Sequence, residues 1–438
     1  MTMYHLVKRA IVATLFISAS VGSASAIDIQ EVTSPGGITA WLVSDDTVPV
    51  VAVDIAFKGA GSSQDPEGKA GRANLLASTI DEGAGDMDSV AFQTALQDNA
   101  VRLSFDSSRD HLYGDLTTLS SSVEQGFNLL RLALTEPRFD DEALTRIRAQ
   151  ITVGLRREQN DPDNVVARLW SRTAFPDHPY GVPANGTVES VANLGHDDMV
   201  DAFKHGIARD NLVIAVVGDI DADTLAALLD STFGDLPEHA DLADVAEVEP
   251  AMGLTVSDTV DTPQTAIRFG GPGLPRSDPD FIPAYVMNHI IGGGAFSSWL
   301  FQEVREKRGL AYTVYSYLAP YAHTAVFGGG TATRNDQAQE AVKVILDQFE
   351  RMATEGPTEE ELADAKAYLT GSYALRFGSS SSIARQLLFI QIEDLGMDYI
   401  DKRNDLVEAV TLEDVRRAAR RIFGEGRPTV AVVGAPAG

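Results

Sequence analysis

Histidines are the side chains in this sequence best suited to hold a catalytic metal, and their spacing argues against a helical zinc site. Such a site needs two imidazoles on one helix face, as in H-E-x-x-H or H-x-x-E-H, where the histidines are four residues apart. The eight histidines stand at positions 5, 111, 178, 196, 205, 239, 289 and 323, and no two are four apart. His111 beside Asp110 is a candidate ligand, but we interpret it as a surface or strand residue.

Other catalytic motifs are also missing. The sequence has no cysteine, which excludes thiol nucleophiles, disulfides, cysteine zinc fingers and iron–sulfur clusters. It has no G-x-S-x-G nucleophile motif. Gly68-Lys69 lacks the rest of a phosphate-binding loop, and the glycine triplet at 292–294 does not match G-x-G-x-x-G.

One stretch near position 300 combines polar side chains with clear structural signals. The glycine triplet leads into a predicted helix over about 297–307, Gly309 is placed as its C-cap, and a strand follows. Arg305 lies in the last turn of this helix and Tyr312 at the start of the strand. A basic residue there favours the helix dipole, and an aromatic residue suits a half-buried strand. Spacing alone favours these structural explanations over a role in chemistry.

The elements that position these residues belong to an acidic globular chain. The 438 residues suffice for two or three domains, and 44% of them are apolar, which favours a large core over disorder. Lys and Arg total 35 against 63 Asp and Glu, a formal net charge of −28. Because such a chain repels polyphosphate, we expect no nucleic-acid partner.

The first 26 residues have the pattern of a secretory signal peptide. Lys8 and Arg9 precede an apolar run over 10–22, and Ala24-Ser25-Ala26 offers a cleavage site. A membrane anchor is the alternative, but this run is short for a bilayer span. We expect cleavage after Ala26, a periplasmic or secreted location, and no membrane span in the mature chain.

The sequence contains an internal duplication. The tetrapeptide Ala-Val-Val-Gly at 215–218 recurs at 431–434, a shift of 216 residues. Asp198 and Asp414 stand at the same shift, each 17 residues before the tetrapeptide. Further upstream, helical patterns that open near Asp141 and Glu359 match at a shift of 218. Several matches in order at nearly one shift indicate duplication.

Each copy reads as strands, then helices, then a returning strand. Runs 49–57 and 265–269 have strand patterns, runs 121–134 and 337–354 have helical patterns, and apolar runs 212–217 and 429–433 close the copies. This order predicts an α+β fold, a tandem duplication of two similar α/β sandwich domains, each an antiparallel sheet packed with helices. We expect domains at 27–236 and 251–438, with an acidic, proline-bounded linker at 237–250.

Three stretches resemble the pitrilysin or insulinase family of zinc peptidases, and most closely its bacterial paired-subunit branch, relatives of mitochondrial processing peptidase. They are residues 61–85 (GSSQDPEGKAGRANLLASTIDEGAG), 178–187 (HPYGVPANGT) and 278–316, which contains the specific run REKRGLAY. The resemblance covers nearly the whole mature chain. It implies two clam-like halves, in agreement with the duplication.

The resemblance also implies a zinc motif, H-x-x-E-H, that this chain lacks. The motif should fall on Asn74-Leu75-Leu76-Ala77-Ser78, where both histidines and the general-base glutamate are replaced. The further glutamate ligand should fall near 153–154, where Val and Gly stand, and Glu158 is out of register. We therefore expect that this chain binds no zinc and that the degenerate positions Asn74, Ala77 and Ser78 lie on a core helix.

The resemblance gives Arg305 and Tyr312 a role, because an arginine and a tyrosine at this spacing contact the substrate carbonyl and the tetrahedral intermediate in the family. Such donors stabilise an oxyanion. The leading hypothesis is a non-zinc-binding subunit of a heteromeric metallopeptidase, inactive alone. Its partner would be a homologous H-x-x-E-H subunit that supplies the zinc, and its substrate an unfolded peptide. The glycine segment 292–294 could pair with extended substrate, act as a hinge, or form a simple tight turn.

Two other functions stay open at this point. The chain could be a non-enzymatic peptide-binding or scaffold protein of the same fold, in which Arg305 and Tyr312 would be dispensable. It could also be a stand-alone zinc peptidase with atypical ligands, such as His111 with nearby carboxylates. One tightly held zinc in the isolated protein would favour the last of these.

Overall fold

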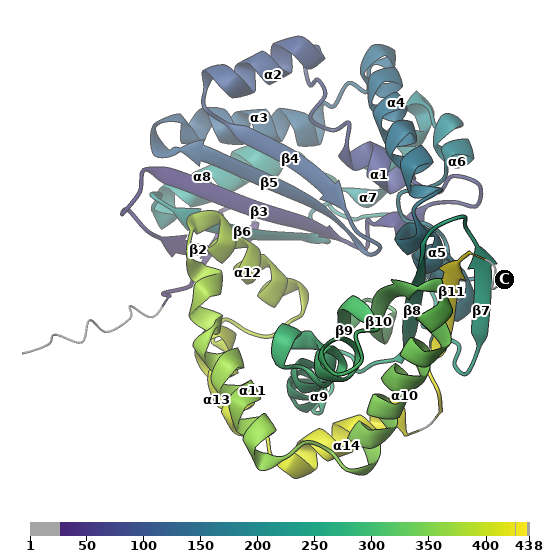
Figure 1. Cartoon of the computed structure of the whole chain (residues 1–438). Helices are drawn as coiled ribbons and strands as arrows, with labels where there is room; N and C mark the ends of the chain where they lie inside the picture. The colour runs from purple at the N-terminus through teal and green to yellow at the C-terminus, as the bar shows by residue number, and fades with distance from the viewer. Residues whose placement is uncertain (1–26, 425, 436–438) are drawn as a thin grey trace, which may run out of the picture.

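The computed structural model describes residues 27–424 and 426–435, and Figure 1 shows two halves, each built on one β-sheet. The predicted signal peptide at 1–26 lies outside the described residues. Across 27–424 and 426–435, no helix has the length and apolar character that a bilayer span requires.

The first sheet has six strands in the order β1-β2-β6-β3-β5-β4. Its strands are β1 (Gln30–Thr33), β2 (Thr39–Ser44), β3 (Val50–Lys58), β4 (Arg102–Ser107), β5 (His111–Leu119) and β6 (Leu212–Gly218). Side chains alternate along β3, so that Val51 and Val53 enter the main helical core while Ala52 and Ala56 face the other side. Every neighbouring pair is antiparallel except β2 and β6, which are parallel.

The second sheet repeats this arrangement with five strands in the order β7-β11-β8-β10-β9. Its strands are β7 (Thr255–Thr259), β8 (Gln264–Pro272), β9 (Ala311–Tyr321), β10 (Thr324–Arg334) and β11 (Thr429–Gly434). The repeated tetrapeptides lie on β6 and β11, and each of these strands has one parallel and one antiparallel neighbour. The predicted α+β duplication is confirmed, with mixed sheets in place of purely antiparallel ones.

The helices follow the same duplicated order. Those of the first half are α1 (Arg72–Ala77), α2 (Ser89–Asp98), α3 (Val123–Thr135), α4 (Asp141–Glu158), α5 (Pro162–Ala174), α6 (Val188–Ala192), α7 (His196–Gly206) and α8 (Ala222–Phe233). Those of the second half are α9 (Phe281–Asn288), α10 (Ala338–Thr354), α11 (Glu359–Gly371), α12 (Ser380–Ile392), α13 (Tyr399–Glu408) and α14 (Leu412–Phe423). The helices predicted to open near Asp141 and Glu359 are therefore α4 and α11.

Short helical turns join these elements. The 3₁₀ turns are η1 (Ser62–Gln64), η2 (Ser120–Ser122), η3 (Pro179–Gly181), η5 (Ala295–Ser297), η7 (Asn335–Gln337) and η8 (Tyr373–Phe377). Two π-helical turns, η4 (His289–Gly293) and η6 (Phe301–Glu306), follow α9. π-Helical turns are uncommon and often occur at functional sites.

Each half gives one helix to the sheet of the other half. Helix α5 packs on β8 and β11, and α12 packs on β3 and β6, as Figure 1 shows. Trp170 of α5 and Leu387 of α12 are buried in the resulting apolar clusters. Because α5 follows α4 and α12 follows α11, the exchange is reciprocal and binds the two halves together through apolar burial.

The segment 237–250 runs between the halves without forming a helix or strand. Its backbone is nevertheless attached to both. The Asp241 N–H donates to the His205 carbonyl at 2.9 Å, and the Val248 N–H donates to the His323 carbonyl at 3.0 Å. The segment is therefore held along the molecule at two points although most of its side chains are exposed.

Candidate functional site

Arg305 and Tyr312 form a stacked pair at the start of β9. The guanidinium carbon of Arg305, on η6, lies 4.4 Å from the centroid of the Tyr312 ring and 4.7 Å from that of Phe301. Such cation–π contacts orient a guanidinium. The Arg305 side chain is 28% exposed and Tyr312 is 77% exposed. Another molecule can therefore reach both groups.

The turn between the two residues sets this geometry. The helix predicted over 297–307 is observed as η5, a short α-helical turn and then η6, which is wound more widely than an α-helix. Gly309 adopts φ +62°, as a C-cap glycine does, and its N–H donates to the Arg305 carbonyl at 2.8 Å. The Leu310 N–H donates to the Val304 carbonyl at 2.9 Å. The chain thus reverses and brings Tyr312 back beside Arg305.

The glycine triplet packs against the same strand. Gly292 lies in η4 and is buried. A Cβ atom at this position would lie 2.4 Å from Ser316 Oγ and 2.8 Å from the Ser316 backbone nitrogen. The Ser316 hydroxyl in turn donates to Asn288 Oδ1 at 2.7 Å. Glycine at 292 is therefore required for the close approach of η4 to β9, which carries Tyr312.

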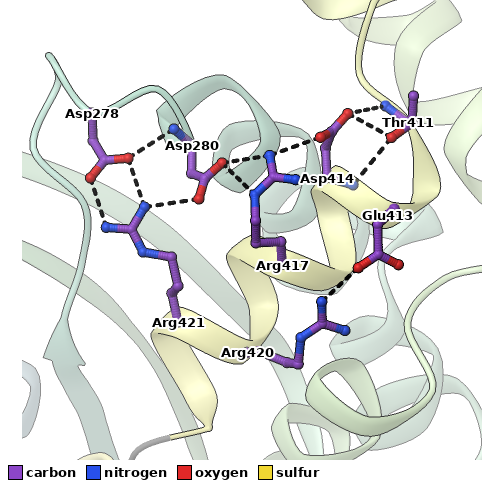
Figure 2. Close-up of polar contacts among 8 residues, drawn as sticks. All are labelled: Asp278, Asp280, Thr411, Glu413, Asp414, Arg417, Arg420 and Arg421. Carbon is purple, nitrogen blue, oxygen red and sulfur yellow. Dashed lines mark hydrogen bonds and ion pairs between the residues drawn. The ribbon is translucent and has the colours of Figure 1, made fainter.

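A network of carboxylates and guanidinium groups anchors the start of α9, the helix that leads into η4 (Figure 2). Arg417 of α14 donates to Asp280 at 2.9 and 2.7 Å, and Arg421 donates to both Asp278 and Asp280 at 2.7–2.9 Å. The Asp280 side chain is only 8% exposed. These hydrogen bonds hold the pKa values of Asp278 and Asp280 below their usual range, since they stabilise the ionised carboxylates.

The network extends to the first turn of α14. Thr411 and Asp414 form a capping box, in which the Thr411 N–H donates to Asp414 at 2.9 Å and the Asp414 N–H donates to the Thr411 hydroxyl at 3.2 Å. Hydrogen bonds from Thr411 and the neighbouring Arg417 lower the pKa of Asp414 to about 2. Helix α14 thus supports α9 and, through it, the turns that carry Arg305.

The positions of the missing zinc motif lie on α1 and at its C-cap, Ser78. Ala77 is 2% exposed in the core, while Asn74 and Ser78 are half-buried. The Ser78 hydroxyl donates to the Asn74 carbonyl at 2.8 Å, a bond from the C-cap to the last turn of the helix. Asn74, Ala77 and Ser78 offer neither imidazole nor carboxylate, so this donor set does not fit a zinc ion.

The position of the third zinc ligand is equally unsuited. Val153 on α4 is 49% exposed, and a Cβ atom at Gly154 would meet nothing within 4 Å. Over the described ranges, no three His, Asp or Glu side chains are grouped so that they could hold a metal ion.

His111 is a strand residue, as interpreted from the sequence. It begins β5, and its Nδ1 accepts a hydrogen bond from the Gly59 N–H at 3.2 Å. Burial lowers its pKa. The neighbouring Asp110 accepts hydrogen bonds from the Tyr180 hydroxyl at 2.5 Å and the Ala322 N–H at 3.0 Å, so its two oxygens have structural partners.

His111 does line a large cavity, of about 950 Å³, which the sequence did not predict. The cavity lies at the turn after Tyr321, at the far end of β9 from Tyr312. Nine residues of extended strand separate these ends by about 30 Å. The structure therefore brings Arg305 and Tyr312 together but keeps His111 apart from them.

Two further residues of this cavity were missed. Asp54 on β3 and Asp115 on β5 are direct cross-strand neighbours. The available signal was a carboxylate in the middle of the apolar run 50–57, where a strand would bury it.

Comparison with known proteins accounts for this architecture. A family model described as "Insulinase (Peptidase family M16)" matches residues 40–188, and a model described as "Peptidase M16 inactive domain" matches residues 193–369. A relative from Helicobacter pylori, described as "Non-peptidase homolog YmxG", is 28% identical over 378 residues, which are 84% of this chain and 85% of the relative. A relative from Bacillus subtilis, described as "Uncharacterized zinc protease YmxG", is 25% identical over 405 residues, 91% of this chain and 96% of the relative.

A solved structure agrees with the sequence comparisons. A Pseudomonas fluorescens protein described as a peptidase M16 inactive domain has a TM-score of 0.88 and 26% identity, and the match covers 94% of this chain and 98% of that one. The two sheets, the duplicated order of elements and the family matches agree with the resemblance inferred from the motifs. The chain belongs to the insulinase, or M16, peptidase family.

Proposed function

We propose that this chain is a non-zinc-binding subunit of a heteromeric metallopeptidase. In this role Arg305 and Tyr312 bind the carbonyl of an unfolded peptide substrate and stabilise the tetrahedral intermediate. A homologous partner subunit that contains H-x-x-E-H holds the zinc. The observation that carries the proposal is the contrast between an Arg305–Tyr312 pair with an exposed tyrosine and an α1 helix without zinc ligands.

The arrangement suits oxyanion binding for a physical reason. The contacts with the Phe301 and Tyr312 rings orient the guanidinium group, and its Nε also lies 3.6 Å from the Glu306 carboxylate. An oriented donor costs little reorganisation when negative charge develops on the substrate oxygen. The enclosure that strengthens such a contact would come from the partner subunit.

The names of related proteins support a non-catalytic chain. The H. pylori relative is described as a non-peptidase homologue, and the model on residues 193–369 describes an inactive domain. The same descriptions favour a second candidate function, a peptide-binding or scaffold protein in which Arg305 and Tyr312 are dispensable. The signal-peptide pattern leads us to propose a periplasmic or secreted location for either function.

The test begins with co-purification of the chain from its native source and mass identification of what associates. We expect a homologous protein with H-x-x-E-H, no stoichiometric zinc on the isolated chain, and peptide cleavage only by the complex.

Substitutions in the complex test the two residues. Arg305→Ala should lower kcat/KM by about 10²–10³-fold, and Tyr312→Phe should lower it by about 10-fold. Arg308→Ala and Tyr315→Phe are matched controls, because Arg308 pairs with Glu303 and Tyr315 lies on the same strand. Unchanged turnover in both site variants would favour the scaffold role.

A further inference from the structure

The cavity of about 950 Å³ lies between the first sheet and two elements of the second half, α12 and the β9–β10 turn. Its wall includes the apolar side chains of Leu388, Phe389 and Ile392 on α12. Its floor is the inner face of β3, β5 and β4, where Asp54 and Asp115 lie side by side. An apolar wall thus faces a pair of carboxyl groups.

Asp54 is the unusual member of this floor. It is 5% exposed, and its Oδ2 atom has no hydrogen-bond partner among the described residues. Burial removes an ionised carboxylate from bulk solvent, which is costly unless a partner compensates it. Most buried carboxylates of folded proteins are paired, and Asp54 instead faces a cavity that can admit a partner.

The cationic side chain beside the pair lies on the side of Asp115. The nearest cationic side chain to the pair, Arg385 of α12, is 69% exposed and lies 3.9 Å from Asp115 Oδ2. On the other flank of β3, Asp54 faces Ala215 of β6, which carries no charge. The other charged or titratable groups that line the cavity are Lys58, Arg102, Asp106, Asp110, His111, Tyr113, Tyr321 and Glu393. Carboxyl groups therefore outnumber Lys and Arg in the lining by five to three.

A proton can stand in for the missing cation. Burial and the charge of Asp115 raise the pKa of Asp54 to about 7. In its acid form Asp54 can donate a hydrogen bond to Asp115 and so satisfy both carboxyls. A ligand cation that reaches the pair would displace this proton, since both compete for the same charge.

We propose that the cavity binds an amphipathic monocation, with its ammonium or guanidinium group on Asp54 and Asp115 and its apolar body against Leu388, Phe389 and Ile392. A free organic amine and a basic side chain flanked by apolar residues in a peptide share this chemistry. The site is distinct from the Arg305–Tyr312 pair, from which β9 separates it. It needs neither a partner subunit nor zinc, so it does not rest on the proposed function.

The experiment is isothermal titration calorimetry on the isolated full-length mature chain. The free-amine probe is 4-phenylbutylamine, with 4-phenylbutanol as its neutral analogue. The peptide probe is acetyl-Leu-Arg-Leu-amide, with citrulline in place of Arg as its neutral analogue. We expect at least one cation to bind at least ten-fold more tightly than its neutral analogue. Binding of the amine identifies a free ligand, and binding of the peptide alone identifies a chain-borne one.

Two further measurements connect binding to the carboxyl pair. Asp54→Asn should weaken binding of the cation at least ten-fold, while Asp223→Asn, which removes an exposed carboxylate on α8, should not. Below pH 7, binding should release up to one proton, and affinity should rise with pH. A thermal melt confirms that each variant is folded. Equal binding of cations and neutral analogues, an unaffected Asp54→Asn variant, or affinity that falls as pH rises from 5 to 7 would overturn the proposal.

Discussion

The indole N–H of Trp170 donates a hydrogen bond at 3.1 Å to the carbonyl of Thr429, 259 residues further along the chain. Trp170 lies on α5 of the first half, and Thr429 begins β11 of the second sheet. The reverse contact comes from α12, where Gln391 donates to the Ile214 carbonyl of β6 at 3.1 Å. Each sheet is therefore covered on one face by a helix that the other half supplies.

This exchange predicts that the two halves unfold together. Trp170→Ala should lower the free energy of unfolding by about 3–5 kcal/mol, because a 5% exposed indole is replaced by a cavity. The loss should appear as one shifted transition in urea, followed by circular dichroism. Phe296→Ala is the matched control, since its 70% exposed ring should contribute less than about 0.5 kcal/mol. Two separate transitions in the wild-type chain would contradict the interpretation.

The network on α14 predicts a specific sensitivity to acid. Arg417 and Arg421 hold the pKa values of Asp278 and Asp280 below their unfolded values. The stability from these ion pairs is therefore present above about pH 4 and is lost as pH falls through the lower folded-state pKa values. Arg417→Ala should flatten this loss, as measured by urea unfolding between pH 2 and 6.

The same network predicts that its two arginines act together. Arg417→Ala alone should cost about 1–3 kcal/mol at pH 7, because Asp280 is 8% exposed and keeps only Arg421. The double variant should cost more than the sum of the single ones, since Asp280 then has no cationic partner. Additive losses in the double-mutant cycle would show that the two arginines do not share Asp280.

The glycine contact at β9 predicts opposite effects at two glycines. Gly292→Ala should destabilise the chain by about 1–3 kcal/mol, because its Cβ would lie 2.4 Å from Ser316 Oγ. Gly154→Ala lies inside α4 with open space around the new methyl group, so it should stabilise by about 0.5–1 kcal/mol. Thermal melts of the two variants provide the comparison. A Gly292→Ala variant as stable as the wild type would show that η4 is free to move, as a hinge would be.

Much of this architecture follows from the sequence, because the relevant signals are local. The strand pattern at 49–57 corresponds to β3, the helical pattern at 337–354 to α10, and the repeated Ala-Val-Val-Gly to the equivalent strands β6 and β11. The contact between Arg305 and Tyr312 depends on a local signal, because Gly309 reverses the chain between them. In each case the residues that determine the feature are neighbours in sequence.

The features that could not be predicted from the sequence depend on contacts between residues far apart in the chain. Nothing in the helical pattern of α5 shows that Trp170 packs on a strand that contains Thr429. The parallel pairing of β2 with β6 also joins segments far apart, so the sheets were expected to be antiparallel. Asp54 and Asp115 are 61 residues apart in sequence, and only the register of β3 with β5 makes them a pair.

That pair predicts how stability changes with pH. The folded-state pKa of Asp54 is raised to about 7, above its unfolded value of 3.8. Between these values the unfolded chain loses the proton that the folded chain keeps, so the contribution of Asp54 makes stability fall from about pH 4 to pH 7.

The Asp54→Asn variant lacks this titration. Relative to the wild type, it should gain stability across that range, by at most about 4 kcal/mol at pH 8. Asp106→Asn, an exposed carboxylate of the same cavity, serves as the control. Chemical unfolding at pH 5 and pH 8 measures the difference, and an equal pH dependence in wild type and Asp54→Asn would show that Asp54 ionises normally in the folded chain.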